Sequence, residues 1–163
     1  MTTAQIVYGI NTDLTHTLTG LASDTNLIAG RESTARDNTT DDAIDAIVQG
    51  KATTGTTPTA SRQIEVWAYG SVDGTTYSAG ATGTDANFSP TGEKTLMKLL
   101  TIIPTDATSD HVYNWGPFSI AQAFGGTMPR NWGIFIVHNT GVAFNITAAN
   151  QETTYTPVKY ESV

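Results

Sequence analysis

Three histidines are the side chains of this 163-residue chain best suited to acid–base or metal chemistry. His16, His111 and His138 lie far apart in the sequence, and none has another histidine or a close carboxylate at metal-ligand spacing. His138 stands near the end of an apolar run, as a strand-end residue would. Surface or strand-end positions are therefore favoured over a metal or general-base role.

The carboxylates form no recognisable catalytic or cation-binding pattern. Asp41, Asp42 and Asp45 are clustered, but they lack the alternating Asp/Asn spacing and the closing Glu of a calcium loop. The glutamates suggest no glycosidase pair, and neither a G-x-S-x-G motif nor a P-loop occurs. The chain has no cysteine, which excludes thiol nucleophiles, zinc–thiolate sites and disulfides. The sequence predicts a protein that is not an enzyme and has no catalytic, cofactor-binding or metal-binding residues.

Aromatic side chains are the other candidate ligand-binding groups. A sugar-stacking platform could be built from several of them, as in β-sandwich lectins, or they could fill the core and subunit interfaces. Trp67 lies opposite the apolar Ile64 and Val66 in an alternating run, which favours packing for this residue. The residues concerned are Trp67, Tyr69, Trp115, Phe118 and Trp132.

The composition argues for β structure and against two classes of partner. With 15 acidic against 8 basic residues, a net charge of −7 and no basic run, binding to nucleic acid is not expected. No stretch approaches the roughly 20 apolar residues of a membrane span. Only 14% of residues are charged, whereas there are 30 threonines and 15 glycines. Threonine suits the solvent face of a pleated sheet, so an all-β domain is indicated.

Alternation and turn residues divide the chain into short strands. The segment 41–50 is left open between helix and strand, because Ile44, Ile47 and Val48 fit either. Asp73-Gly74 and 139–141 predict the turns of two β-hairpins. Loops are expected at 31–42, 53–61 and 78–93, the last being functional or mobile. Strands are expected at 13–22, 63–69, 94–103 (a central strand), 113–120, 132–138, 142–147 and 153–160.

About eight strands with long connections predict an antiparallel β-sandwich, of jelly-roll type. We expect a flexible N-terminal arm at 1–12 and a single sandwich domain at 13–163. The arm and the 78–93 loop are polar and poor in core residues, so they are the segments expected to reach partners. The residues expected at such contacts are Thr2, Thr3, Ile6, Tyr8 and Phe88.

One run in the C-terminal third is more distinctive than the rest. It reads FGG-x-x-P-x-x-WG from Phe124 to Gly133 and continues to the turn at 139–141. Two adjacent glycines permit a tight bend and the proline halts strand pairing, so an architectural role is predicted. The residues that carry the motif are Phe124, Gly125, Gly126, Pro129, Trp132, Gly133, Asn139 and Gly141.

Together with the 66–77 segment, this motif resembles small structural proteins of tailed bacteriophages, over roughly residues 14–160. The resemblance implies a jelly-roll decoration (cement) protein on the outer surface of the virion capsid. It also favours a strand at 41–52. The implied partners are the major capsid protein and further copies of the chain, with a homotrimer expected because capsid lattices offer threefold positions. Two alternatives stay open: a tail or fibre component with a carbohydrate-binding face, and a hydrolase with an unrecognised site.

Overall fold

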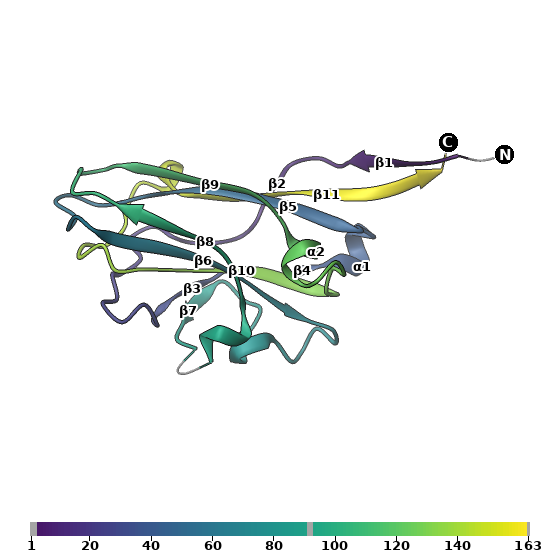
Figure 1. Cartoon of the computed structure of the whole chain (residues 1–163), viewed down its shortest axis with the longest axis horizontal. Coiled ribbons are helices and arrows are strands. Elements are labelled where there is room, and N and C mark those ends of the chain that lie inside the picture. The colour runs from purple at the N-terminus through teal and green to yellow at the C-terminus, as the bar shows by residue number, and fades with distance from the viewer. Residues whose placement is uncertain (1–2, 91–92, 163) are drawn as a thin grey trace.

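Two antiparallel sheets lie face to face in the computed structural model, which describes residues 3–90 and 93–162 (Figure 1). One sheet has the order β1 (Ala4–Tyr8), β11 (Glu152–Ser162), β5 (Asp45–Thr53) and β9 (Val112–Ser119), and β2 (Thr12–Asp13) also pairs with β11. The other has the order β7 (Ala86–Phe88), β3 (Gly30–Glu32), β10 (Asn131–His138), β6 (Arg62–Ser71) and β8 (Lys98–Thr105), and β4 (Arg36–Asp37) also pairs with β10. The predicted all-β antiparallel sandwich is confirmed.

The eight principal strands follow the order of a jelly roll. Numbered along the chain as β1, β3, β5, β6, β8, β9, β10 and β11, the first, eighth, third and sixth form one sheet. The second, seventh, fourth and fifth form the other. All the connections between these eight strands cross between the sheets except that from β6 to β8. Short helical turns occupy Asn38–Asp41 (α1), Ser78–Gly80 (η1), Lys94–Leu96 (η2), Ile120–Ala123 (α2) and Ala148–Asn150 (η3).

The main core lies between the two sheets. In β6, Ile64, Val66 and Ala68 point into it, as the alternation predicts. Trp132 and Tyr155, from opposite sheets, meet edge to face with ring centroids 5.4 Å apart. Leu14, Leu18 and Leu21 join the same core from outside the sheets. No helix among the described residues is long and apolar enough to cross a membrane.

A second core covers the opposite face of β6 and β10. Residues 72–90 and 93–97 fold over this face, so Trp67, Tyr69 and Phe135 are buried as well. Phe88 meets Phe135 edge to face at 5.7 Å between centroids. The fully buried Glu32 accepts hydrogen bonds from the backbone amides of residues 82 and 83. The predicted 78–93 loop is therefore largely packed on the sheet.

An ion pair between a partly exposed lysine and a buried carboxylate fastens this covering segment. Lys94 Nζ lies 2.6 Å from Glu65 Oε2, and it also donates to the backbone oxygen of Leu27. The Trp67 indole donates to the same carboxylate oxygen at 2.9 Å, and the Gln63 amide donates to the other at 2.8 Å. The lysine ammonium also lies 5.2 Å from the centroid of the Trp67 ring. The pair joins β6, η2 and the 24–28 turn.

Two predicted strands are wrong. Residues 13–22 are strand only at β2, because their buried leucines are spaced by four and three residues and not by two. Residues 142–147 contribute a single bridge, Thr54 to Phe144, and the predicted hairpin is absent from this described segment. Phe144 instead folds back and stacks on His138, with ring centroids 3.8 Å apart.

Three further predictions are corrected, and one alternative is settled. The Asp73-Gly74 turn does not form the predicted hairpin. Asp73 accepts hydrogen bonds from the amides of Thr75 and Thr76, and the chain then continues over the sheet and reaches the strand that pairs with β6, β8, only at Lys98. Residues 94–103 become η2 and the edge strand β8, with Pro104 inside the strand. The 31–42 loop contains β4, α1 and the end of β3. The open segment 41–50 is a strand from Asp45 onward.

We expect Lys94→Ala to lower the free energy of unfolding by about 3 kcal/mol, because it leaves the Glu65 carboxylate buried without its cation. Urea denaturation measures this. Lys51→Ala is the matched control, since the Lys51–Glu152 pair is more exposed, and it should cost less than about 1 kcal/mol. Equal losses in the two variants would contradict the role given to the Lys94–Glu65 pair.

Stability should fall as the pH drops from 6.5 towards 4. Burial lowers the pKa of His138 to about 4, whereas in the unfolded chain it titrates near 6.5. The unfolded state therefore takes up a proton first in this window, which removes about 3 kcal/mol of stability. Burial lowers the pKa of His16 to about 4 as well, which acts in the same direction.

Urea titrations at several pH values measure this dependence. His138→Gln should make it shallower, whereas His111→Gln, which removes a more exposed histidine, should leave it steep. If the free energy of unfolding of His138→Gln depended on pH as steeply as that of the wild type, the buried His138 imidazole would not be the cause of the dependence.

Candidate functional site

The three histidines belong to separate hydrogen-bond networks. His138 is fully buried, with Nε2 3.0 Å from the backbone oxygen of Leu21 and Nδ1 2.9 Å from Thr140 Oγ1. His111 Nδ1 lies 3.1 Å from the Asp106 carboxylate in the β8–β9 connection. His16 lies between β3 and β11, where it contacts the backbone oxygen of Arg31. Each histidine joins chain segments to one another.

The aspartate cluster does not converge on a shared point. Asp41 makes two 2.7 Å hydrogen bonds to Arg36, which hold the pKa of its carboxyl below the usual value. Asp45 Oδ1 instead accepts the backbone amides of Ala46 and Ala121. Within 3–90 and 93–162, no three His, Cys, Asp or Glu side chains come together to hold a metal.

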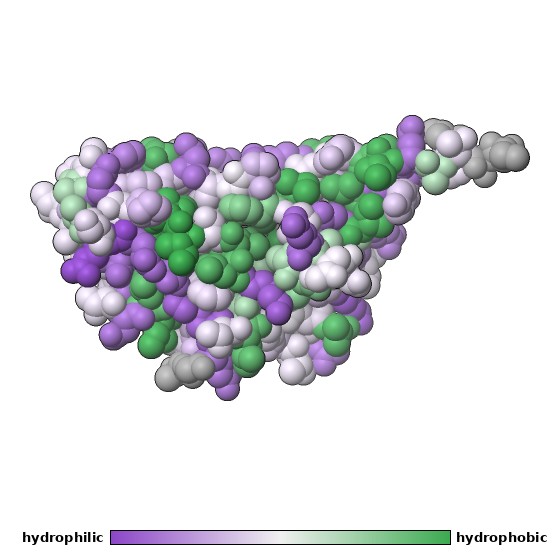
Figure 2. Space-filling view, viewed as in Figure 1, coloured by the Kyte–Doolittle hydropathy of each residue, from purple (hydrophilic) through white to green (hydrophobic). Residues whose placement is uncertain are grey.

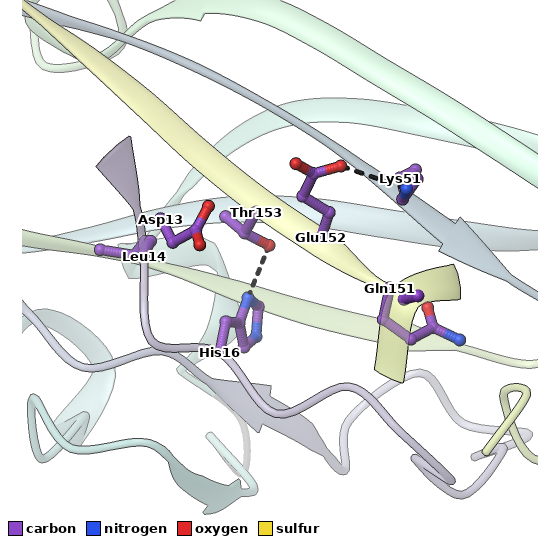
Figure 3. Close-up of a pocket in the computed structure, with 8 residues that line it drawn as sticks. Asp13, Leu14, His16, Lys51, Gln151, Glu152 and Thr153 are labelled. Carbon is purple, nitrogen blue, oxygen red and sulfur yellow. Dashed lines mark hydrogen bonds and ion pairs between the residues drawn. The ribbon is translucent and has the colours of Figure 1, made fainter. Parts of the chain in front are cut away.

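A polar cavity of about 330 Å³ lies between β11, β5 and the segment after β2 (Figure 3). His16 points from that segment to Thr153, with Nδ1 3.1 Å from its hydroxyl oxygen. A carbonyl only accepts, so the hydrogen at Nε2 is donated to Arg31, and Nδ1 accepts from Thr153. Across the cavity, Lys51 and Glu152 pair at 3.3 Å. These groups are engaged within the chain, and the cavity presents no activated base or nucleophile among them.

Of the two roles left open for the aromatic side chains, the sugar-stacking platform is not found on the surface. Trp67, Trp115 and Trp132 have 9% or less of their surface exposed, and Tyr69 is fully buried. Phe118 is partly buried against the main core. The packing role favoured for Trp67 is confirmed by its place in the second core.

The motif residues are arranged around the two ends of β10. Phe124 and Pro129 lie over Gly70, so closely that a Cβ at that glycine would meet both within 3.0 Å. Gly125 and Gly126 end α2 with φ of +82° and +98°. At the other end, Asn139 exchanges hydrogen bonds with the backbone of Gln63 and extends the β6–β10 ladder. Gly141 donates its amide to Ser23.

The N-terminal segment is bound to the sheet over most of its length. β1 pairs with the last five residues of β11, and hydrogen bonds from Gly9 and Leu14 continue the pairing on either side of β2. The register shifts by one residue between β1 and β2, so residues 10 and 11 form an irregular step. The predicted arm thus contains an edge strand. Thr3 is exposed, and Thr2 lies outside the described residues.

The ribbon, formed by β1 and residues 158–162 of β11, projects beyond the body of the sandwich (Figure 1). Ile6 lies directly opposite Tyr160, and Tyr8 opposite Val158, so these four share one face. Ile6 is 56% exposed, Tyr8 71% and Tyr160 62%. Because Tyr155 of β11 points into the core, alternation turns this face away from it. The ribbon is the strongest candidate binding surface of the described chain.

Sequence reasoning found half of this surface. Ile6 and Tyr8 were expected at partner contacts, and both are exposed on the ribbon face. Tyr160 is absent from that expectation, because it is the last residue of the predicted strand 153–160. The sequence feature that points to Tyr160 is its spacing of two residues from Val158. The two apolar residues therefore share one face of a strand whose other residues are polar or face the core. Phe88, also expected at a contact, is packed against Phe135.

No family model, no curated protein and no solved structure matches the chain.

We expect Gly133→Ala to destabilise the fold strongly, because a Cβ at this position would lie 2.3 Å from the Tyr69 ring, whose hydroxyl is bonded to the backbone of Ser33. A cost of about 2–3 kcal/mol is expected from overpacking. Gly125→Ala is the control: its Cβ meets open space, and only its positive φ is penalised, at about 1 kcal/mol. Thermal unfolding compares the two, and a smaller effect at residue 133 would refute this account of the motif.

Proposed function

We propose that the chain is a non-enzymatic structural protein of a tailed-phage virion, which binds the outer surface of the assembled capsid and bridges neighbouring major capsid subunits. The observation that carries the proposal is the ribbon with its exposed apolar face. The jelly-roll order of the strands and the FGG-x-x-P-x-x-WG motif agree with the family that the sequence resembles.

The physics of the ribbon supports a binding role. A two-stranded ribbon is marginally stable in water unless something packs against it. Three large side chains are aligned on one face of this ribbon, whereas exposed apolar residues elsewhere on a surface are usually scattered. A partner that covers Ile6, Tyr8 and Tyr160 removes apolar area from water and stabilises the strand pairing.

Attachment to a capsid lattice requires several copies of the ribbon contact to form at the same time. One ribbon face is too small to give the area of a stable interface by itself. Several ribbons held in one assembly reach high avidity, because the second contact forms at a high effective concentration. The low fraction of charged residues, 14%, agrees with a role in which packing dominates over long-range attraction.

The residues considered for a sugar-stacking platform give the carbohydrate-binding alternative little support. Stacking on a sugar needs an exposed ring face, and the three tryptophans and Tyr69 are buried. We therefore keep the capsid-binding proposal alone.

The proposal is tested by co-sedimentation with shells of the major capsid protein encoded by the same genome. Replacing Ile6 and Tyr8 together by threonine puts residues of high β-propensity into β1 but removes its apolar face. We expect the dissociation constant for shells to rise at least tenfold, which corresponds to about 1.4 kcal/mol.

The matched control is Gln5→Thr with Val7→Thr, on the other face of the same strand. It should bind as the wild-type protein does. Wild-type protein that does not sediment with shells, or equal binding by both double variants, would refute the ribbon as the capsid contact.

A further inference from the structure

The outer edge of β1 is a strand edge without protection. β1 lies at the end of its sheet, and among the described residues only β11 pairs with it. Its five residues include no charged residue, proline or glycine, and its register with β11 is continuous from Ala4 to Tyr8. In Figure 2 the ribbon stands clear of the body of the sandwich. Charges, prolines and irregular pairing are the features that usually prevent the addition of a further strand, and β1 has none of them.

The other sheet edges do carry such features. β8 contains Lys98 and Pro104, and its ladder with β6 shifts register between Val66 and Trp67. β9 contains Pro117, and its ladder with β5 also shifts register. β7 has only three residues. Within the described chain, β1 is therefore the edge best suited to accept another strand.

The hydrogen bonds of β11 show which backbone groups of β1 face this edge. In an antiparallel pair, opposite residues alternate between exchanging hydrogen bonds and directing their N–H and C=O groups outward. Gly9 donates its amide to the oxygen of Pro157, so this pair is of the bonded kind. The oxygen of the next residue, Val158, accepts the amide of Ile44 on the far side of β11. Val158 and its opposite residue Tyr8 therefore exchange no hydrogen bonds within the ribbon.

The same alternation continues through β1. Gln5 and Val7 bond to β11, whereas the N–H and C=O groups of Ile6 and Tyr8 point away from it. Ile6 and Tyr8 also carry the exposed apolar side chains, so the same two residues present outward backbone groups and apolar surface. An extended strand suits both features, because its backbone continues the ladder and its alternate side chains lie beside Ile6 and Tyr8.

We propose that the ribbon binds by strand addition: one extended segment of a capsid subunit pairs with the outer edge of β1 and places apolar side chains beside Ile6 and Tyr8. This inference rests on the proposed function and specifies how the ribbon is covered. Two copies of the chain repel each other through their net charge of −7, so the segment is assigned to the capsid subunit and not to a second copy.

Amide hydrogen exchange of the full chain, free and bound to capsid shells, tests the proposal at single residues. In the free protein, the amides of Ile6 and Tyr8 should exchange faster than those of Gln5 and Val7, which are bonded to β11. Binding to shells should slow exchange at Ile6 and Tyr8 by about tenfold or more, because their N–H groups then donate to the added strand.

The outcomes separate this inference from the proposed function. A chain that sediments with shells while Ile6 and Tyr8 exchange as in the free protein would overturn strand addition and leave the proposed function intact. A chain that does not sediment with shells would refute both. Slow exchange at Ile6 and Tyr8 that develops in the free protein as its concentration rises would give the edge to a second copy and overturn the assignment to the capsid subunit.

Two variants at one position separate the backbone donor from the side chain. Ile6→Thr and Ile6→Pro both remove the apolar side chain, but only proline also removes the outward N–H. Proline is tolerated on an edge strand where the N–H faces solvent, and slow exchange at Val7 verifies that the ribbon is retained. The dissociation constant for shells should be about tenfold higher for Ile6→Pro than for Ile6→Thr. Equal constants with Val7 still protected would overturn the proposal; if Val7 loses protection, the exchange result on the wild-type chain decides.

Discussion

The pairing of β6 with β10 is the constraint on which the rest of the structure depends. The two strands share eight consecutive residue pairs, and every residue of β10 is buried. A strand pair that is dry on both faces needs a packed layer on each side. The second sheet supplies one layer, and residues 72–90 and 93–97 supply the other. The long connection after β6 is therefore required for burial of Trp67, Tyr69 and Phe135.

Burial on both faces also explains how the few ionisable groups near this ladder are used. Each buried charge needs a partner, so Glu65 takes Lys94 and Glu32 takes backbone amides of the covering segment. His138 is held neutral by burial and fastens the irregular 14–29 segment through Leu21. The side chains best suited to acid–base chemistry, Glu32, Glu65 and His138, thus serve to hold segments outside the strands onto the sandwich.

The fold class was predictable because local sequence patterns identify β6, β9, β10 and β11 as strands. These patterns are alternation of apolar and polar residues or a continuous apolar run. The errors fall where long-range contacts decide the outcome. Leu14, Leu18 and Leu21 enter the core from an irregular chain, and Phe144 is drawn back by stacking on His138 instead of forming a hairpin. Of the ribbon face, Ile6 and Tyr8 were accessible to sequence reasoning through their apolar character in a polar segment. Tyr160 was not, because its alignment with Ile6 is set by strand register.

The ribbon extends one edge of the sandwich while remaining tied to the sheet. Every residue of β1 pairs with one of the last five residues of β11, and β11 is itself paired with β5 from Glu152 to Val158. A flexible arm would spread its contacts over many distances, whereas a ribbon paired to β11 presents Ile6, Tyr8 and Tyr160 in one orientation, which lowers the conformational entropy lost on attachment.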